Sequence, residues 1–263
     1  MSERRPITLI TGASAGIGAA LARTFARNGH TLMLVARREQ RLLDLADEIA
    51  ALGHPRPYCQ PVDLERHDAV DHIAGAMERL GVEPDIVVNN AGFGLLGPAA
   101  SLSRAEQLAM VDVNVRALTD VSLAFVDALE RHKGGILNVA SVAAFLPGPN
   151  MAVYYATKAY VLSFSDALHW ELRPRGVRVT VVCPGPVPTE FQARAGFAGD
   201  SNTDMLTQSA DQVAESSYRA LRQGRRLVVP GALNRLTAAV TRLLPRRFLT
   251  EAVGRYNRKR IPK

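Results

Sequence analysis

The segment Thr11-Gly12-Ala13-Ser14-Ala15-Gly16-Ile17-Gly18 lies between two stretches of different hydrophobic patterning. Before it, residues 7–11 form a short apolar run that predicts a buried strand, and after it residues 16–27 have the apolar spacing of a helix. Three glycines between a predicted strand and a predicted helix are typical of a turn that binds a dinucleotide. Because a plain strand–helix turn does not need three glycines, the segment predicts a nucleotide site.

The residues of this turn suit different tasks. Gly12 permits the tight turn, Gly16 lets the backbone approach a pyrophosphate, and Gly18 allows the helix to pack closely. The N-terminus of the following helix presents free N–H groups and a positive dipole end to the phosphate. Ser14 can donate a further hydrogen bond.

Strand-like and helix-like patterns alternate along the rest of the chain. Further strands are predicted at 31–36, 58–62, 85–89, 135–140, 177–183 and 227–229, and further helices at 39–52, 69–80, 104–131, 154–172 and 210–223. Repeated strand–helix units with almost continuously apolar strands predict a parallel sheet covered by helices on both faces. Right-handed crossovers then give a doubly wound, Rossmann-type α/β fold with ligands at the carboxyl ends of the strands.

We expect a single domain, because no internal repeat or linker interrupts the chain. Residues 1–232 are predicted to form the Rossmann-type domain, including a substrate lid at about 186–208. Residues 233–263 are predicted to form a basic helical tail, either packed on this domain or extending from it.

Composition excludes several classes of protein. The 263 residues are 47% hydrophobic and 22% charged, which is typical of a globular chain. The two cysteines, Cys59 and Cys183, form no disulfide framework, and no run of about 20 apolar residues predicts a membrane span. We therefore expect a cytoplasmic protein. The six histidines have no metal-ligand spacing, so we expect no metal.

The net charge of +7 is concentrated near the C-terminus. Residues 219–263 hold 13 of the 32 basic residues and one of the 25 acidic residues, so the rest of the chain is slightly acidic. Such a basic segment suggests an anionic partner, although a solvated helix face or a subunit contact explains it as well. No zinc-finger, ribonucleoprotein or helix-turn-helix pattern supports nucleic-acid binding, whereas a weak contact with an anionic membrane surface remains open.

The same segment has apolar residues at helical spacing. Leu236, Val240, Leu243 and Leu244 follow this spacing, with Arg235 and Arg242 along the same segment. This pattern suits an interfacial helix on anionic lipid, a helix docked on the body of the protein, or a lid over a substrate pocket. We favour the intramolecular alternatives.

Tyr154 and Lys158 form the clearest candidate for catalysis. Their i,i+4 spacing within the predicted helix at 154–172 puts both side chains on one face. A phenol has a pKa near 10, and a neighbouring ammonium favours its ionised form. A half-buried core aromatic is the alternative for Tyr154. Tyr155 has no cation at i+4, and we assign it to packing or to the substrate wall.

Two polar residues complete this candidate site. Ser141 follows the predicted strand at 135–140, which places its hydroxyl at the carboxyl edge, where it can donate to a substrate oxygen. No Gly-x-Ser-x-Gly elbow surrounds it, which argues against a nucleophilic role. Asn114 interrupts an otherwise apolar helix, at a cost in helix propensity.

These motifs together resemble the short-chain dehydrogenase/reductase family. The turn has the spacing GxxxGxG, and the rest of the family's pattern follows in chain order: Asp63, Asn89-Asn90-Ala91-Gly92, Asn114, Ser141, Tyr154 to Lys158, Pro184-Gly185 and Thr189. The resemblance implies hydride transfer between a nicotinamide and a carbonyl or secondary alcohol, and a homodimer or homotetramer. It makes Asn114, Ser141, Tyr154 and Lys158 the catalytic set, with Asn114 holding a water that links Lys158 to solvent.

The resemblance also implies a set of cofactor contacts. Asp63 would accept from the adenine amino group, or cap the following helix, and Asn90 would contact the ribose, with Gly92 allowing close approach. The full expected set is Gly12, Ser14, Gly16, Ile17, Gly18, Arg37, Arg38, Asp63, Asn90, Gly92, Tyr154, Lys158, Pro184, Gly185, Val187 and Thr189.

Arg37 and Arg38 indicate which nicotinamide cofactor is bound. They follow the second predicted strand, where an NAD-binding fold of this type usually has an acid. A guanidinium can pair with a 2′-phosphate, so we expect NADP(H). Two solvated arginines are the alternative. Ala15 departs from family members that have a second basic residue in the glycine turn, so this prediction depends on the two arginines alone.

Two other functions remain open from the sequence: a non-catalytic nucleotide sensor, and a membrane-surface interaction protein on the same fold. The complete set of four candidate catalytic residues favours the enzyme. Apolar residues near the site suggest a lipophilic or aromatic substrate: Phe93, Leu95, Leu96, Phe145 and Leu146.

Overall fold

The sheet order of this chain explains where its site lies. The computed structural model describes residues 4–197, 207–241 and 243–261. Within these residues, seven strands pair in parallel in the order β3-β2-β1-β4-β5-β6-β7. Their bounds are β1 Arg5–Thr11, β2 Leu32–Ala36, β3 Tyr58–Pro61, β4 Val82–Asn89, β5 Gly135–Val139, β6 Arg178–Val182 and β7 Leu227–Val228. The order reverses between β1 and β4, and this switch point is where such sheets bind ligands.

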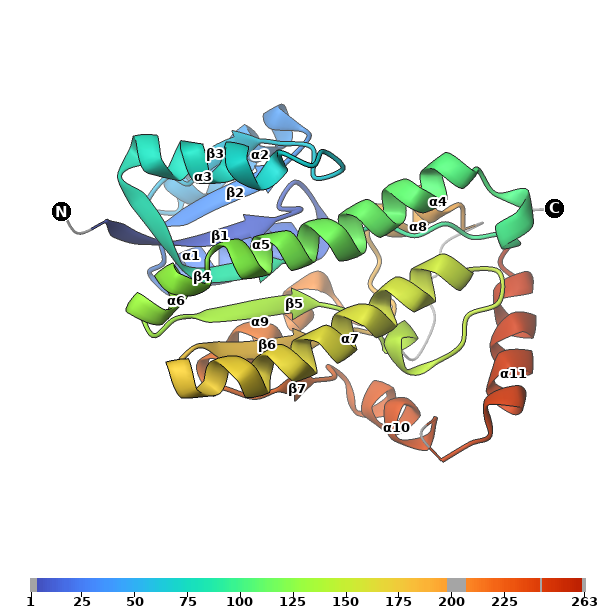
Figure 1. Ribbon diagram of the computed structural model, residues 1–263. Helices are drawn as coiled ribbons and strands as arrows, with labels where there is room; N and C mark the ends of the chain where they lie inside the picture. Colours follow the sequence, from blue (N-terminus) through green and yellow to red (C-terminus); the bar gives the residue numbers. More distant parts are fainter. Residues whose placement is uncertain (1–3, 198–206, 242, 262–263) are drawn as a thin grey trace.

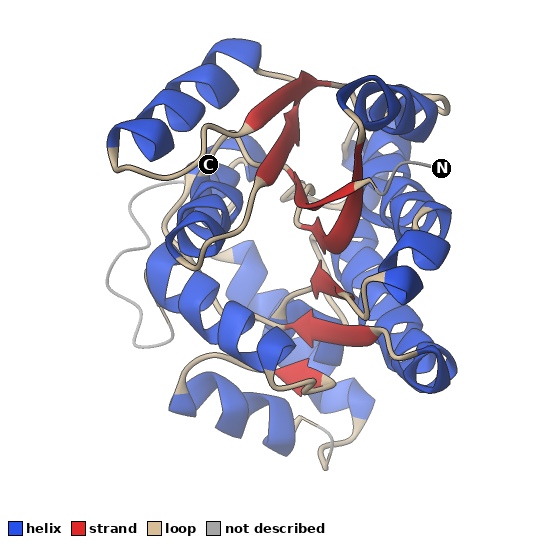
Figure 2. Cartoon of the chain, turned by 90° about the vertical axis from the view of Figure 1, so that its left-hand side faces the viewer, coloured by secondary structure: helices blue, strands red, loops and turns tan. Residues whose placement is uncertain are grey.

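Helices cover both faces of the sheet (Figures 1 and 2). One layer contains α1 (Gly16–Arg27), α2 (Glu39–Ala51) and α9 (Ala210–Arg222), whose buried residues share one core cluster. The other contains α3 (Ala69–Leu80), α5 (Leu118–Ala124), α6 (Val126–Arg131) and α7 (Ala152–Leu172). The predicted single-domain, doubly wound α/β fold is confirmed.

The strands are apolar on both sides because both faces of the sheet are covered. In β1, Leu9 belongs to the core under α3 and α5, while Ile10 belongs to the core under α1 and α2. In β2, Val35 and Leu34 alternate in the same way. Central parallel strands therefore show continuous apolar runs rather than an alternating pattern.

The predicted helix at 104–131 is not continuous. Residues Arg104–Val111 form α4, Asp112–Ala117 form a π-helical segment, and α5 and α6 follow with a break at Phe125. The π-helical segment inserts one residue relative to α-helical spacing, which rotates the side chains that follow it. Hydrophobic periodicity cannot reveal such an insertion, so the expectation of one helix was wrong in this respect.

The tail is helical and packs on the body of the protein through its buried residues, but not through the leucines that its spacing singled out. It forms α10 (Ala232–Val240) and α11 (Arg246–Arg258), which lie beside the carboxyl end of the sheet in Figure 1. Leu236, Val240, Leu243 and Leu244 are exposed and do not pack on the body. Among the described residues, no helix is long and apolar enough to cross a membrane.

A chain of buried amides and hydroxyls crosses the middle of the sheet. Asn89 Nδ2 on β4 donates to Ser122 Oγ at 2.8 Å and to Asn138 Oδ1 on β5 at 2.9 Å. Asn138 Nδ2 in turn donates to Ser165 Oγ on α7 at 2.9 Å. All four side chains are buried, so each needs its partner.

Replacing Asn138 with alanine is expected to lower the free energy of unfolding by about 2–4 kcal/mol, because Asn89 and Ser165 lose partners and a small cavity opens. Urea denaturation followed by circular dichroism measures this loss. Ser216→Ala is the control, since its exposed hydroxyl bonds only within its own helix and its loss should stay within about 0.5 kcal/mol. Similar losses in both variants would contradict the role of the buried chain.

Candidate active site

The glycine-rich turn is held by contacts that tolerate no side chain at two positions. A Cβ on Gly18 would lie 2.2 Å from the carbonyl oxygen of Gly12, so α1 can begin directly over the end of β1. Gly12 itself has φ of 66°, and a Cβ there would lie 2.7 Å from Ala91 Cα. Asn90 Nδ2 donates to the carbonyl oxygens of Thr11 (3.0 Å) and Gly12 (3.1 Å). The loops after β1 and β4 are thereby fixed side by side.

A cavity of about 800 Å³ begins at this turn and follows the carboxyl edge of the sheet. Its volume is within the range of cofactor and ligand sites. Sixteen of the predicted site residues line it: Gly12, Ser14, Gly16, Ile17, Arg37, Arg38, Asp63, Asn90, Gly92, Ser141, Tyr154, Lys158, Pro184, Gly185, Val187 and Thr189. Gly18 and Asn114 do not line it and contribute from behind its wall.

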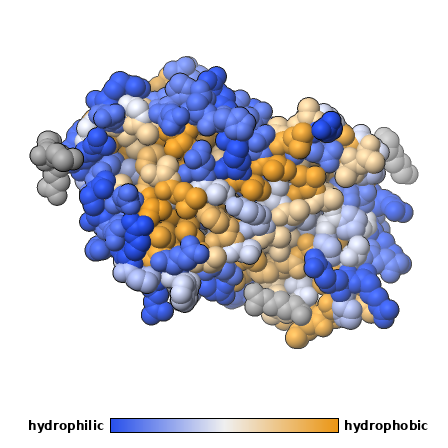
Figure 3. Space-filling view, viewed as in Figure 1, coloured by the Kyte–Doolittle hydropathy of each residue, from blue (hydrophilic) through white to orange (hydrophobic). Residues whose placement is uncertain are grey.

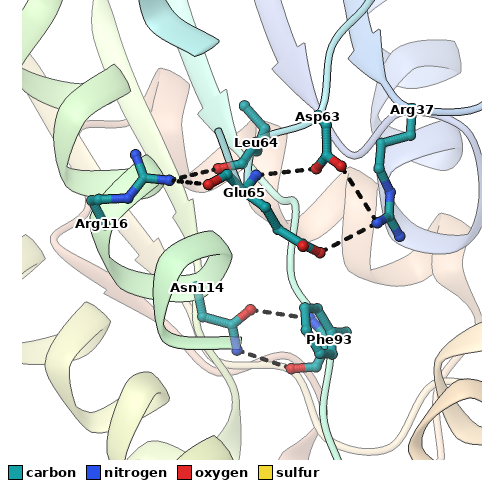
Figure 4. A network of polar contacts seen from close by, with 7 residues as sticks. All are labelled: Arg37, Asp63, Leu64, Glu65, Phe93, Asn114 and Arg116. Carbon is teal, nitrogen blue, oxygen red and sulfur yellow. Dashed lines mark hydrogen bonds and ion pairs between the residues drawn. The ribbon is translucent and has the colours of Figure 1, made fainter. Parts of the chain in front are cut away.

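Charged side chains gather at one end of the cavity, which we call the cationic end (Figure 4). Arg37 Nη1 lies 3.2 Å from Glu65 Oε1 and 3.8 Å from Asp63 Oδ2. Arg38 Nη2 donates to Ser14 Oγ at 3.1 Å, and its Nη1 lies 2.7 Å from an oxygen of Glu190. Asp63 Oδ1 accepts from the backbone N–H of Glu65 and does not cap the following helix, α3. Both arginines therefore face the cavity, each paired with a carboxylate.

Tyr154, Ser141 and Lys158 lie together on the opposite wall. Tyr154 is buried against Phe191, with ring centroids 5.3 Å apart, and its burial raises the pKa of the phenol. A hydrogen bond with the Ser141 side chain opposes this rise in pKa. Ser141 Oγ accepts from the N–H of Ala143 at 3.2 Å, which leaves its own proton free to donate. The two hydroxyls thus meet at one point of the cavity.

Lys158 comes from α7, one turn after Tyr154. Its side chain is 5% exposed, and Nζ donates to the carbonyl oxygen of Val139 at 2.9 Å. Nζ lies 5.9 Å from the centre of the Tyr154 ring, so the two side chains are neighbours on one helix face, as their spacing predicts. Burial lowers the pKa of Lys158 to about 8, because a charged ammonium is poorly solvated there.

Asn114 holds the wall on which these residues lie (Figure 4). Its Oδ1 accepts from the N–H of Phe93 at 3.0 Å, while Nδ2 donates to Phe93 O at 2.9 Å and to Thr157 Oγ1 at 3.1 Å. Gly92 is required here, since a Cβ would lie 2.9 Å from Asn114 Oδ1 and 3.4 Å from Lys158 Nζ. Asn114 therefore joins the loop after β4 to α7, next to the lysine.

Arg116 fixes a second loop, the one that follows β3. From the π-helical segment, its Nη2 donates to the carbonyl oxygens of Leu64, Glu65 and Arg66 at 2.8 to 3.2 Å. This loop carries Asp63 and Glu65, which face Arg37. Sequence analysis did not single out Arg116, although a charged residue in an apolar helix is the same kind of signal as Asn114.

The structure describes part of the segment at about 186–208 that the sequence predicts to be a substrate lid. Thr189 caps α8 (Glu190–Ala195) in a capping box with Gln192, and a Cβ on Gly16 would lie 3.0 Å from Thr189 Cγ2. Thr189 thus packs directly against the glycine-rich turn, and both line the cavity. Residues 198–206 of the predicted lid lie outside the described residues.

The far end of the cavity is mainly apolar. Phe93 and Leu146 line it as expected, whereas Leu95, Leu96 and Phe145 do not, because they pack into the surrounding clusters. Residues of the tail complete the wall, and sequence analysis did not assign them: Thr237, Ala252, Val253, Tyr256, Asn257 and Arg260. Among the described residues, no group of three or more side chains could hold a metal ion.

Asn257 shows how the tail is attached. It is buried, and its Nδ2 donates to the carbonyl oxygen of Pro149 at 2.9 Å. Its side chain also forms a hydrogen bond with Tyr155. Arg260 stacks on the rings of Tyr256 (4.4 Å) and Phe197 (5.2 Å). In the sequence, Asn257 is one more polar residue of a polar helix, so no local signal could have indicated this attachment.

Comparisons with known proteins agree with this geometry. The family model for short chain dehydrogenases matches residues 6–197. Sulfoacetaldehyde reductase 2 of Chromohalobacter salexigens is 38% identical over 188 residues, which cover 70% of this chain and 74% of that protein. The NADP-dependent 3-hydroxy acid dehydrogenase YdfG of Escherichia coli K12 is 36% identical, over 74% of this chain and 77% of that protein. A short-chain dehydrogenase from Sphingobium yanoikuyae, solved in complex with NADPH, is 31% identical with a TM-score of 0.77, over 90% of this chain and 94% of that one.

The lowered pKa of Lys158 can be measured directly. The sequence has four lysines (Lys133, Lys158, Lys259 and Lys263), so a spectrum of 13Cε-labelled lysine has few signals, and Lys158→Met identifies the one in question. We expect its titration midpoint near pH 8 in the protein without ligand, because of burial. A midpoint near the ordinary value of 10.5 would show that this ammonium is well solvated.

The same shift predicts how stability depends on pH. Between about pH 8 and 10.5 the unfolded chain still binds the Lys158 proton, while the folded chain has released it. Since the unfolded state binds more protons, the contribution of Lys158 to the free energy of unfolding rises with pH in this interval. The free energy of unfolding of the wild type minus that of Lys158→Met, measured by urea denaturation, should therefore rise with pH. A constant difference would contradict it.

Proposed function

The chain belongs to the short-chain dehydrogenase family, and on this basis we propose that it is an NADP(H)-dependent oxidoreductase that interconverts a carbonyl compound and an alcohol. The observation that carries the proposal is the position of Ser141, Tyr154 and Lys158 on a wall of the same cavity that the glycine-rich turn lines. The matched proteins are dehydrogenases and reductases, and nothing supports the alternative of a non-catalytic nucleotide sensor.

The residues at the cationic end fit the cofactor. Ser14, Gly16 and Ile17 line the cavity at the start of α1, where the N–H groups of a helix N-terminus would bind a pyrophosphate. Arg37 and Arg38 supply guanidinium groups for a 2′-phosphate. Asp63, which lines the cavity, would accept from an adenine amino group, and Asn90 would act mainly by fixing the turn. When bound, NADP(H) would supply or accept the hydride.

Tyr154 is the proposed proton donor and acceptor. Its raised pKa keeps the phenol protonated at neutral pH, so in carbonyl reduction it is ready to donate to the developing alkoxide. Ser141 donates to the same substrate oxygen and orients it. In alcohol oxidation the phenol must lose its proton, and a protonated Lys158 on the same helix face favours the phenolate. Asn114 positions the loop after β4 and supports a proton path to Lys158.

We propose a lipophilic substrate. Most side chains at the far end of the cavity are rings or aliphatic groups, beside two arginines, Arg194 and Arg260; the apolar ones are Phe93, Val113, Ala143, Leu146, Met151, Tyr155, Phe191, Phe197, Ala252, Val253 and Tyr256. A second candidate is an anionic substrate, because Arg260 lines the same region and the names of two relatives include a sulfonated aldehyde and a hydroxy acid. A screen of neutral ketones, aldehydes, keto acids and acyl thioesters with NADPH, read by absorbance, separates the two.

We further propose a homodimer or homotetramer. The outer sides of α4, α5 and α7 expose Leu108, Val111, Leu123 and Tyr160. Exposed large apolar side chains on adjacent helices are typical of subunit contacts. We also propose a cytoplasmic location, with which Cys59 and Cys183 agree, because neither is in a disulfide bond in the part of the chain that the structure describes. We also propose that residues 1–232 form the dehydrogenase domain and that residues 233–263 form a tail packed on it, which lines part of the cavity.

Tyr154→Phe should reduce kcat by at least about a thousandfold and leave NADPH affinity nearly unchanged, because only the proton-transfer group is removed. Fluorescence titration measures cofactor binding, and NADPH absorbance measures turnover. Tyr155→Phe is the matched control, since Tyr155 lines the cavity but contacts the tail. Retained turnover in the first variant together with its loss in the second would reverse the assignment.

We predict a preference for NADPH over NADH that is lost in the double variant Arg37→Asp/Arg38→Ala, because its 2′-phosphate partner becomes repulsive. The ratio of kcat/KM for the two cofactors should fall by about a hundredfold or more. Arg56→Ala is the control, as Arg56 is exposed, pairs with Asp47 and does not line the cavity. A wild-type enzyme that prefers NADH would show that these arginines are surface charges only.

A further inference from the structure

Helix α10 presents its apolar side to solvent. Its buried positions are Asn234 and Ala238, whereas Leu233, Leu236 and Val240 on the other side are exposed. A helix on the surface of a globular protein normally turns its apolar stripe toward the core. The apolar residues of α10 are therefore not covered by the protein core. We infer that another molecule covers this face.

The exposed apolar surface continues beyond the helix. Leu243 is 84% exposed and Leu236 is 59% exposed, and Leu244 and Phe248 are also exposed. Together these side chains form what we call the apolar tip: Leu233, Leu236, Val240, Leu243, Leu244 and Phe248. Hydrophobic atoms are visible at the lower edge of Figure 3, in the region of α10 in Figure 1. Apolar groups gathered on one projecting segment mark an interaction site.

Cations surround the apolar tip. Arg235, Arg246 and Arg247 are exposed beside it, and the guanidinium of Arg247 stacks on the ring of Phe248 at 4.9 Å. Residues 233–263 contain nine basic residues and a single acid, Glu251. Glu251 is paired with Arg255 at 3.0 Å, so it does not neutralise the arginines next to the tip.

We propose that the apolar tip and its arginines dock this protein on an anionic lipid surface. Exposed leucines and a phenylalanine flanked by arginines match the boundary between acyl chains and negatively charged headgroups. A second copy of the chain fits less well, because a two-fold contact through this face would bring two strongly basic segments together. The short helices on either side of Pro245 lie on the surface of the protein and do not span a membrane.

The docking face and the cavity share the same two helices. Thr237 of α10 and Ala252, Val253 and Tyr256 of α11 line the cavity, while the apolar tip faces outward from this wall. Docking would therefore bring the substrate end of the enzyme close to molecules dissolved in the lipid. This consequence depends on the proposed function, whereas the docking itself does not.

Vesicle co-sedimentation of the full-length protein tests the proposal. The probes are vesicles of phosphatidylcholine alone and of phosphatidylcholine with about 30% phosphatidylglycerol. We expect binding only to the anionic vesicles at low salt, and a loss of binding of about tenfold or more at about 0.5 M salt, where headgroup charge is screened. Binding to both vesicle types alike, or to neither at low salt, would overturn the proposal.

Two variants connect binding to the tip. Leu243→Glu and Arg246→Glu/Arg247→Glu should each weaken binding to anionic vesicles about tenfold or more, because one loses apolar contact and the other loses attraction. The positions are exposed and do not line the cavity, so turnover of a water-soluble substrate with NADPH should be unchanged. Leu52→Glu, an equally drastic change at an exposed leucine of α2's end, is the matched control and should bind like wild type.

Self-association is the competing outcome. If a second copy covers the tip, the wild type will show a larger mass by light scattering than Leu243→Glu, without vesicles present. That result, or wild-type vesicle binding in both tip variants, would overturn the lipid proposal. Absence of any carbonyl reduction, by contrast, would contradict the proposed function and leave the vesicle result to be judged separately.

Discussion

The close contact between the end of β1 and the start of α1 is the constraint from which the site follows. Because Gly18 has no side chain, α1 begins next to the carbonyl group of Gly12, and there Asn90 joins the loop after β4 to the turn. These are the two strands at which the sheet order reverses. A parallel sheet opens at such a point, and the cavity lies there. A single side chain at Gly18 would separate the loops that form the cofactor wall.

The π-helical segment positions the rest of the wall. Asn114 bonds to both polar backbone groups of Phe93 and to Thr157 Oγ1, and Thr157 Oγ1 donates to the carbonyl oxygen of Tyr154 at 2.7 Å. Arg116, two residues later, holds the loop that carries Glu65. From one segment, Asn114 and Arg116 thus fix two loops and α7 together.

The sequence predicts most of the architecture, because strand and helix patterning is strong and local in a βα repeat; α1 and α3, for example, have the predicted bounds. The sequence also predicts that Ser141, Tyr154 and Lys158 lie near one another, and in the structure all three line one cavity. Their catalytic roles stay predictions. Contacts between residues that are far apart in the sequence cannot be predicted in this way. Asn257 bonds to Pro149 over 108 residues, and no local pattern encodes that pairing. Spacing identified the amphipathic tail correctly but could not show that its apolar side faces solvent.

The ion pairs of the cationic end suggest how a preference for a phosphorylated cofactor arises. Arg37 faces Glu65, and Arg38 faces Ser14 and Glu190, so neither guanidinium is free before a ligand binds. These pairs are exposed, and exposed pairs contribute at most about 1 kcal/mol. A 2′-phosphate carries more charge than a carboxylate and accepts bidentate hydrogen bonds, so it can replace the carboxylates with a net gain. The uncharged ribose hydroxyl of NADH cannot replace the carboxylates in this way, so NADH would leave both arginine–glutamate pairs intact. The proposed preference would then come from an exchange of partners, in which Glu65 and Glu190 set how large the advantage is.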